Sequence, residues 1–580
     1  RLRPVGRGRA IVVLPVVEGP RTLLFGVELR GNELLGDREL LEVAELVRGA
    51  PFSYLGLEEA LGRMTERYQE RGYLYARIEP EVRFSADRER AEVVLTVVER
   101  FEVRFGAIAI EGAERTDEGL IREVLRFEEG ALYRPSVVRA SQESLMALGV
   151  FTSVNIAPQN PDLPERVKPV TVTVRERMPQ YLDFQLGIST GQGLRTSLEY
   201  GYRNLFGQAL AFTARGQLGL QFFFQDEDLR RNIGGLPASE RLERRFNLAL
   251  ALPQISGVPN LRASLDLVHL RDNQRLFGLD KNGGVLAFNW QPLARLSFTW
   301  SAEIEQNDVQ LFGDRGGFEE IIEEEMGNPQ IARLLRVPEG NSIVVSTRLS
   351  AALDQRDSPF VPTEGWFGSA AAEWVRTLAT EAQADGTSFF SHFLKLTGTL
   401  NGYLPIGDVV IAAQVRAGGI VHLEDGSQTY PNRQFFLGGV DSLRGFNQAQ
   451  LQPQDAAEFQ LAGLGERSPF DSLLSGGDFF YLVRTEVRFP IFASLQGAVF
   501  GDLGNHWADP STVVLGGCGP AAGGADLSAT DCLFVRPTAG LGLRLATPVG
   551  PLALDYGFNV LRREALNEPV GAFHFSIGVF

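Results

Sequence analysis

The chain contains little cysteine, little lysine and no long apolar run, and each shortage excludes a class of protein. Its 580 residues include two cysteines, too few for a disulfide scaffold or a zinc ribbon. No stretch approaches the roughly 18 uninterrupted apolar residues of a membrane-spanning helix. Three of the 56 basic residues are lysine, and the formal net charge of −16 offers nucleic acid no basic footprint. A helical membrane protein and a general nucleic-acid binder are therefore excluded.

Glycine and aromatic residues are abundant instead. The sequence has 63 Gly, 39 Phe and 12 Tyr, and 44% of its residues are hydrophobic. This composition is too apolar and too aromatic for a disordered chain. Residues 1–20 carry no signal-peptide pattern. Many half-apolar segments without a long apolar run are typical of a membrane β-barrel, which crosses the bilayer with alternating strands.

Before residue 178 the chain repeats one pattern of helices and strands twice. In residues 21–100 an apolar strand precedes two helical stretches and two alternating strands, and residues 101–178 repeat this order. Each unit is predicted to be an α+β domain with the order β-α-α-β-β. The expected strands are 23–29, 74–84, 91–99, 103–110, 150–157 and 168–175, and the expected helices are 37–48, 57–71, 116–126 and 135–148.

Residues 1–20 resemble the end of another such unit. A Val-Val-Glu run at 16–18 matches Val-Val-Glu-Arg at 97–100 and Val-Arg-Glu-Arg at 174–177, where the two full units close. Nothing that could form the rest of a unit precedes this segment. We therefore expect residues 1–20 to be the C-terminal end of a truncated repeat.

After residue 178 the sequence alternates with a period of two, as in half-buried strands. Phe246, Leu248 and Leu250 share one face of such a segment, while Asn247 and Ala249 share the other. Short and long connections alternate along residues 179–580, which predicts a transmembrane barrel of sixteen antiparallel strands. A large soluble β protein is the alternative, but it would not normally sort its loops by side. The sixteen segments are 180–190, 194–204, 209–220, 244–253, 261–271, 284–291, 294–306, 343–354, 365–376, 388–402, 409–421, 477–489, 493–504, 535–546, 551–558 and 571–580.

Four segments of the expected barrel resemble motifs of one family. They are Phe-Phe-Leu-Gly-Gly-Val-Asp-Ser-Leu-Arg-Gly-Phe at 435–446, Phe-Gly-Asp-Leu-Gly-Asn-His-Trp at 500–507, the turn 354–365 and the run 547–557. Together with the repeats, they resemble the outer-membrane protein assembly factor superfamily of the BamA and TamA type. The N-terminal repeats of that family are called POTRA domains.

The resemblance implies a function, a location and a set of partners. It implies an outer-membrane protein, with POTRA repeats in the periplasm, that inserts and folds other β-barrel proteins through a lateral gate. The implied partners are unfolded outer-membrane proteins, outer-membrane lipid, and periplasmic lipoproteins or a TamB-like protein; no nucleic acid, cofactor or enzymatic reaction is expected. A two-partner secretion transporter that exports one partner protein is the main alternative. A passive porin would need no POTRA repeats, and a patatin-type enzyme fusion would need a further N-terminal domain.

Alternation places two carboxylates on the lumenal face of adjacent strands. The apolar residues of 477–489 would face lipid, which points Glu486 inward, and the same argument points Asp502 of the next strand inward. The longest loop, 422–476, contains Arg444, which could reach both carboxylates if the loop folds into the barrel. The alternative is a solvated surface turn. The predicted docking motif comprises Leu443, Arg444, Gly445, Phe446, Glu486 and Asp502.

The first and last strands would close the barrel, and both contain glycine. Glycine weakens strand order, so the seam is predicted to pair poorly and to expose an edge that accepts another strand. The C-terminal aromatics resemble an outer-membrane sorting signal, although the last is out of phase with the others. The expected seam residues are Gly187, Gly571, Phe573, Phe575, Gly578 and Phe580.

The remaining signals indicate structure rather than chemistry. In an oxidising compartment Cys518 and Cys532 are expected to form a disulfide across a surface loop. Gly187 to Gly191 reads G-x-S-x-G, but that hydrolase motif needs a strand-to-helix turn and here another strand follows. The five histidines show no metal-binding spacing. No catalytic residue and no metal ligand is predicted.

Overall fold

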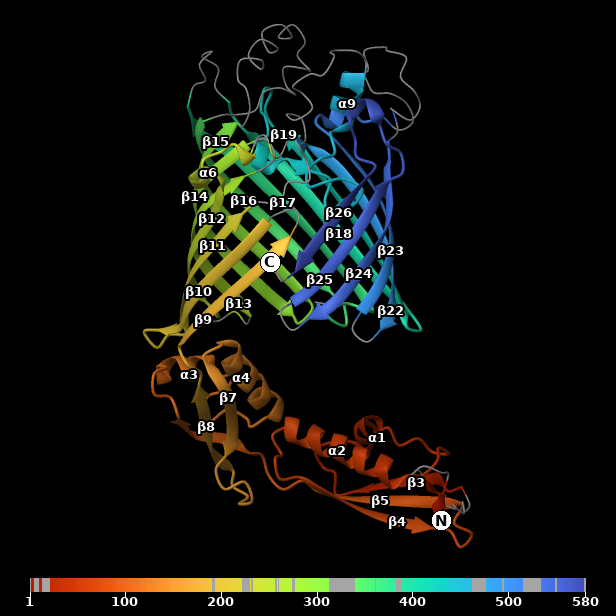
Figure 1. Cartoon of the computed structure of the whole chain (residues 1–580). Coiled ribbons are helices and arrows are strands. Elements are labelled where there is room, and N and C mark those ends of the chain that lie inside the picture. Colours follow the sequence, from red (N-terminus) through yellow and green to blue (C-terminus); the bar gives the residue numbers. More distant parts are fainter. Residues whose placement is uncertain are drawn as a thin grey trace. The chain divides into compact units, whose positions relative to one another are not determined.

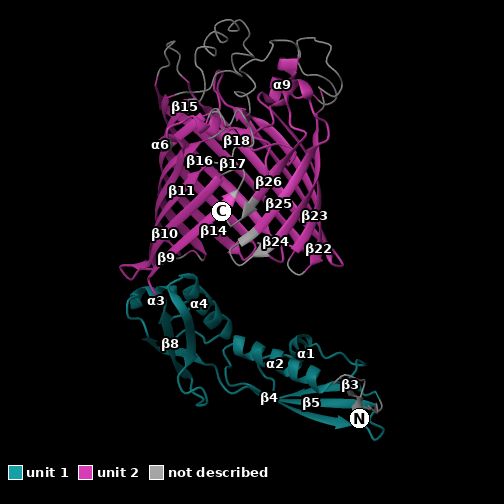
Figure 2. Cartoon of the chain, in the orientation of Figure 1, with its two compact units in different colours: residues 1–177 teal, residues 178–580 magenta. Residues whose placement is uncertain are grey.

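The computed structural model divides into two compact units, residues 1–177 and residues 178–580, coloured separately in Figure 2. Each unit has its own fold and is described by itself. The described residues are 2–4, 10–12, 21–189, 193–221, 230, 233–255, 258, 260–273, 277–311, 340–359, 361–381, 389–461, 476–492, 495–514, 532, 534–547 and 550–577.

The first unit contains the two predicted repeats. In the first, β3 (Leu23–Arg30) pairs in parallel with β5 (Arg90–Val98), and β4 (Arg77–Phe84) pairs antiparallel with β5. Helices α1 (Asp37–Ala44) and α2 (Tyr54–Glu70) bury Leu40, Leu57 and Met64 in one core with β5. Both helices are amphipathic, so their apolar faces pack against the sheet and their charged faces stay in water.

The second repeat has the same topology. Strand β6 (Arg104–Glu111) pairs in parallel with β8 (Val167–Glu176), and β7 (Phe151–Pro158) pairs antiparallel with β8. Its helices are α3 (Glu118–Val124) and α4 (Pro135–Ala147). Gly112 has a φ of +85°, and a Cβ there would lie 2.1 Å from the Val174 carbonyl oxygen, so this turn requires glycine. The predicted β-α-α-β-β order is confirmed in both repeats.

The segment before the repeats is described only in part. Strand β1 (Leu2–Pro4) pairs antiparallel with β2 (Ala10–Val12). The predicted closing-strand motif at 16–18 lies outside the described residues. None of the described helices is long and apolar enough to cross a membrane.

The second unit is a closed antiparallel barrel of sixteen strands among the described residues (Figure 1). Sixteen alternating segments were expected, and each corresponds to one of these strands. The strands are β9 (Gln180–Ser189), β10 (Gly193–Leu205), β11 (Leu210–Leu220), β12 (Leu242–Leu252), β13 (Leu261–Asn273), β14 (Phe277–Leu293), β15 (Leu296–Leu311), β16 (Gly340–Asp354), β17 (Gly365–Thr380), β18 (His392–Ile406), β19 (Val409–His422), β22 (Phe479–Phe492), β23 (Leu495–Trp507), β24 (Arg536–Thr547), β25 (Gly550–Asn559) and β26 (Gly571–Ile577).

Alternation along each strand separates an apolar outer face from a polar lumen. On β12 the side chains of Phe246, Leu248 and Leu250 are exposed on the outside, whereas Asn247 and Ala249 turn inward. Connections of two to ten residues join the strands at one end of the barrel, and most connections at the other end are longer, except 190–192 and 274–276. The small elements of the loops are α6 (Ala238–Arg241), η1 (Pro431–Arg433), β20 (Phe435–Phe436), α9 (Gln454–Leu461), β21 (Gly476–Gly477), η3 (Pro510–Thr512) and η5 (Glu564–Leu566).

Candidate functional site in the barrel lumen and seam

The loop between β19 and β22, residues 423–478, enters the barrel and is called the lumenal loop here. Leu443 and Phe446 at its tip are fully buried and belong to one apolar cluster with Phe480 and Leu482 of the wall. Two positive-φ glycines, Gly438 and Gly439, let the chain turn sharply before the tip. The structure thus places the tip of this loop inside the barrel, against its wall.

Arg444 at the tip holds two lumenal carboxylates. Its Nε and Nη2 donate to Asp502 Oδ2 and Oδ1 at 2.9 and 2.7 Å, and its Nη1 donates to Glu486 Oε2 at 2.7 Å. The Arg444 backbone N–H also donates to Asp502 at 3.2 Å. Asp502 is completely buried and Arg444 nearly so. A guanidinium fork matches a carboxylate in two hydrogen bonds, so this geometry fixes the direction of the loop tip as well as its charge.

Further arginines on the wall complete the charge balance around Glu486. Arg488 Nε donates to Glu486 at 2.9 Å, and Arg544 bridges Glu486 and Asp555 at 3.3 and 2.6 Å. The Arg444 guanidinium carbon also lies 3.4 Å from the centre of the Phe500 ring. Buried charges are tolerated only when paired and hydrogen-bonded, and here each carboxylate faces at least one guanidinium.

The loop tip also contacts the last three strands. A Cβ on Gly445 would lie 2.6 Å from Cγ2 of Thr538, and a Cβ on Gly557 would lie 2.2 Å from the Arg444 carbonyl oxygen. That carbonyl also lies 3.1 Å from Nε2 of His574 on β26. Glycine at 445 and 557 lets the loop backbone approach the wall this closely. Thr538, Gly557 and His574 were not predicted, although Gly557 ends the 547–557 motif.

A second group of charges anchors the lumenal loop to the opposite part of the wall. Arg433 donates to Glu305 of β15 at 2.8 Å, lies 3.5 Å from Glu303 and makes a short contact with Glu373 of β17. Lys281 of β14 pairs with Glu303 at 2.6 Å and also contacts Glu305. This network was not predicted, although alternation along β15 and β17 would have turned its three carboxylates into the lumen.

The outer part of the lumenal loop is tied to its neighbour at the long-loop end. Asp455 of α9 accepts the backbone N–H groups of Ala508 and Asp509 at 3.0 and 2.8 Å and the Thr512 hydroxyl at 3.1 Å. Its burial raises the pKa of this carboxyl to about 6. Of the predicted disulfide, Cys532 is disulfide-bonded, and Cys518 lies outside the described residues.

The barrel seam between β26 and β9 is paired over a short length. Among the described residues it has two paired positions, Ser576 with Ser189 and Ile577 with Ile188. The neighbouring pairs, β9 with β10 and β25 with β26, run over ten and seven positions. Ser189 is the last residue of β9, so the part of β26 before Ser576 extends past the end of its neighbour.

The predicted seam residues have distinct positions. Gly187 is buried on β9 opposite Arg195 of β10, and Phe573 is exposed on the outer face of β26. Gly571 pairs with Phe558 of β25, where a Cβ would lie 2.4 Å from the Gly557 carbonyl oxygen. This glycine thus allows close packing of β26 against β25. Phe575 is half-buried, and Gly578 and Phe580 lie outside the described residues.

The fold and the site together define the class of protein. It is a membrane barrel with POTRA-type repeats, because two α+β repeats precede an antiparallel sixteen-strand barrel that has an apolar outer face and a docked lumenal loop. The model of the Omp85 superfamily domain matches residues 204–580. The POTRA model, described as a surface antigen variable number repeat, matches residues 26–100 and 103–177. The chain belongs to the Omp85 superfamily, as the motifs predicted, and is an outer-membrane protein with periplasmic POTRA repeats.

Relatives of this chain include assembly factors. The outer membrane protein assembly factor BamA of Nitratidesulfovibrio vulgaris is 22% identical over 576 residues, which cover 98% of this chain and 63% of that protein. Outer envelope protein 80, chloroplastic, of Arabidopsis thaliana is 23% identical over 549 residues, covering 90% of this chain and 62% of that protein. The chain thus spans less than two thirds of either relative.

A solved structure shows the same fold. The crystal structure of BamA from Haemophilus ducreyi lacking POTRA domains 1–3 superposes with a TM-score of 0.69 at 16% identity, covering 96% of this chain and 99% of that one. The predicted fold class, a membrane barrel with POTRA repeats, is therefore confirmed.

Proposed function

We propose that this protein inserts and folds β-barrel proteins into the outer membrane through a lateral gate between β9 and β26. The observation that carries the proposal is the seam: among the described residues it pairs at two positions, where adjacent strands pair at seven to ten. The similarity to proteins named assembly factors supports the same function.

The seam leaves strand edges that a client can use. Residues 180–187 of β9 and 571–575 of β26 have no partner across the seam among the described residues. Unpaired backbone groups are costly in hydrocarbon, and an incoming strand satisfies them by pairing with the free edge. Each further client strand then pairs with the one before it. The free energy of insertion comes from the client's own folding into lipid and requires no nucleotide.

The POTRA repeats are proposed to receive clients or accessory proteins. Strands β4 and β7 each lie at an edge of their sheet, because the strand orders are β3-β5-β4 and β6-β8-β7. Beside β4, the rings of Phe52, Tyr54 and Phe84 form a cluster with centroids 5.2 to 6.5 Å apart, and Tyr54 is largely exposed. A free edge next to exposed aromatics suits an unfolded outer-membrane protein, a periplasmic lipoprotein or a TamB-like partner.

A disulfide across the seam tests the gate. We would introduce S189C with S576C into the full chain, reconstitute it in liposomes, and follow the folding of a urea-denatured barrel client by its heat-dependent gel mobility. Oxidised S189C/S576C should slow client folding at least tenfold, and reduction should restore it. The matched control is T213C with A249C, a pair between two fully paired strands, β11 and β12.

The outcome separates the proposal from its main alternative. If the locked seam folds clients at the rate of the control, the lateral gate is wrong. If the locked protein instead still exports a soluble partner through its lumen, the two-partner secretion mechanism replaces the lateral gate as the proposed function.

A further inference from the structure

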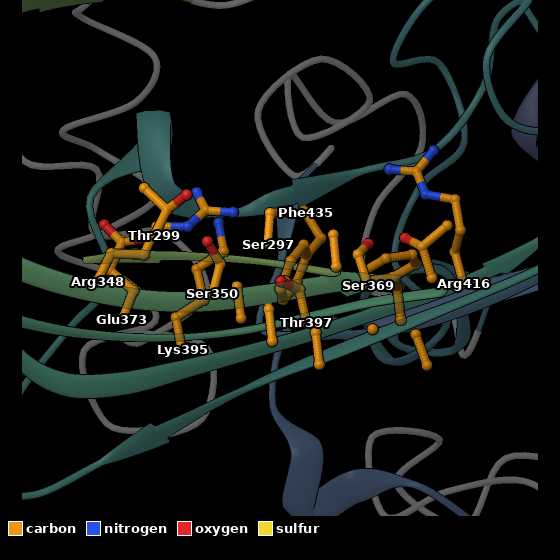
Figure 3. Close-up of a pocket in the computed structure, with 18 residues that line it drawn as sticks. Ser297, Thr299, Arg348, Ser350, Ser369, Glu373, Lys395, Thr397, Arg416 and Phe435 are labelled. Atoms are coloured by element: carbon orange, nitrogen blue, oxygen red, sulfur yellow. The ribbon is translucent and has the colours of Figure 1, made fainter. Parts of the chain in front are cut away.

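Below the lumenal loop, the wall contains a cavity of about 500 Å³ that the proposed gate does not use (Figure 3). Strands β15 to β19 form its floor, and Phe435 of the loop with Phe480 of β22 close one side. A volume of this size is typical of a small-molecule site and exceeds what a single ion needs.

Strand register arranges the floor in three rows. Arg348, Glu373 and Lys395 are paired in the first row. The second row holds Ser350 and Thr397, two residues further toward the short-turn end, and the third holds Ser369, Thr399 and Arg416. Arg348 on β16 and Arg416 on β19 are three strand spacings apart across the sheet, about 14 Å, and two rows apart along it.

The cavity carries excess positive charge. Glu373 is its only lining carboxylate among the described residues, and Arg433 already engages it. Arg348 forms no ion pair or hydrogen bond with any described residue, and Arg416 donates only to the Asp441 carbonyl, at 3.3 Å. Lys395 donates to the Arg433 carbonyl at 2.7 Å. Two guanidinium groups therefore face the cavity without a carboxylate, in a chain whose net charge is −16.

Hydroxyl groups fill the space between the two guanidinium groups. Figure 3 shows Ser350, Thr397 and Ser369 between Arg348 at one end and Arg416 at the other. The hydroxyls of these three residues make no hydrogen bond within the described part of the chain. The guanidinium groups at the two ends only donate, whereas the hydroxyls between them can donate or accept. The complementary ligand therefore has negative charge at both ends and hydroxyl groups between.

We propose that this cavity binds a phosphorylated polyol, with one phosphate at Arg348 and Lys395 and another at Arg416. A phosphate ester carries about −1.5 to −2 charges and three acceptor oxygens, which guanidinium forks bind in pairs of hydrogen bonds. The hydroxyl rows match the polyol between the phosphates. A lipid headgroup and a free sugar bisphosphate share this chemistry.

Titration calorimetry with glucose 1,6-bisphosphate tests the site. The full chain is used in dodecyl maltoside at low salt, and saturable one-to-one binding is expected. R348Q and R416Q should each weaken binding at least tenfold, and S369A/T397A should weaken it severalfold without changing any charge. R262Q is the matched control, because Arg262 also lacks a partner among the described residues and lies outside the cavity; it should change affinity less than twofold.

A second arm identifies the source of the ligand. In nanodiscs, cardiolipin that competes with glucose 1,6-bisphosphate assigns the site to a lipid headgroup, and lack of competition assigns it to a free phosphate. The proposal is overturned if no saturable binding is seen, or if R262Q weakens binding as much as R348Q and R416Q.

Discussion

The three lysines of this chain occupy positions that suit a compact ammonium group. Lys168 donates to the backbone carbonyls of Asn160 and Leu163 at 2.6 and 2.8 Å, and its side chain is fully buried. Lys395 likewise binds a backbone carbonyl, and Lys281 lies between two carboxylates. Arginine, with its planar fork, serves nearly everywhere else, including the exposed surface. Residue choice therefore follows the shape of the acceptor and not only its charge.

Lys168 gives a prediction at this scale. K168M removes a charged donor from the Asn160 and Leu163 carbonyls, which keep only the Leu163 backbone N–H and the Tyr75 hydroxyl. The turn before β8 should therefore lose about 1–3 kcal/mol of local stability. K168R should also destabilise it, because the larger fork does not fit an enclosed carbonyl pair. Hydrogen exchange of residues 159–168 in the full chain should accelerate in both variants.

The matched control is R175M, which removes an exposed cation from the same strand. Equal exchange in K168M and R175M would show that Lys168 contributes charge alone. Because Tyr75 donates to the same Leu163 carbonyl at 2.7 Å, faster exchange should extend to the junction between the two repeats.

At the scale of elements, each repeat closes with a glutamate that holds the turn before its own first helix. Glu99 accepts the Leu34 backbone N–H at 2.8 Å, and Glu176 accepts those of Arg115 and Thr116 at 3.0 and 2.7 Å. The Thr116 hydroxyl donates to Glu176 as well, at 2.7 Å. The glutamate of the repeated Val-x-Glu-Arg motif thus has a physical role in both repeats.

Glu176 predicts a pH dependence for the second repeat. Burial alone would raise its pKa, but the hydrogen bonds from Thr116 and Arg115 hold the pKa below its usual 4.5. The folded state therefore releases this proton more readily than the unfolded state. The stabilisation is fully present above about pH 4.5 and is lost as pH falls through the lower folded pKa.

We expect E176Q to lower the local stability of residues 112–124 at pH 7. In acid, the local stability of E176Q should become equal to that of the native chain. Hydrogen exchange of that segment, corrected for intrinsic rates, measures it. E143Q removes an exposed carboxylate from α4 and should leave the pH profile unchanged. A profile of E176Q parallel to that of the native chain would contradict the prediction.

Local periodicity explains why so much of the fold could be predicted. Alternation and helical spacing depend only on residues that are close in the sequence. These patterns therefore predict the strands, both repeats and the lumenal direction of Glu486 and Asp502. The Arg433 network joins residues 128 positions apart, and nothing near Arg433 indicates which wall it reaches. The pairing of Ser576 with Ser189 likewise joins strands at opposite ends of the barrel sequence, and no neighbouring residue indicates its register.

At the scale of the molecule, the lumenal loop joins two parts of the barrel wall. Arg444 holds it to β22 and β23, and its carbonyl reaches His574 of β26 beside the seam. Arg433 holds the loop to β15 and β17. The same loop therefore braces the wall at two places and connects this brace to one strand of the seam.

Two independent anchors predict a non-additive response. With either arginine replaced by methionine, the other anchor still holds the loop, so R433M and R444M alone should each change ion conductance in planar bilayers less than twofold. R433M/R444M frees the loop from both walls, leaves five carboxylates without these arginines, and should raise conductance severalfold. R262M, a change to an arginine that has no partner among the described residues and lies away from both anchors, should match the native chain. If the conductance of R444M alone were as high as that of R433M/R444M, Arg433 would not restrain the loop. If the conductance of R433M/R444M were unchanged from the native chain, apolar packing of Leu443 and Phe446 would hold the loop instead.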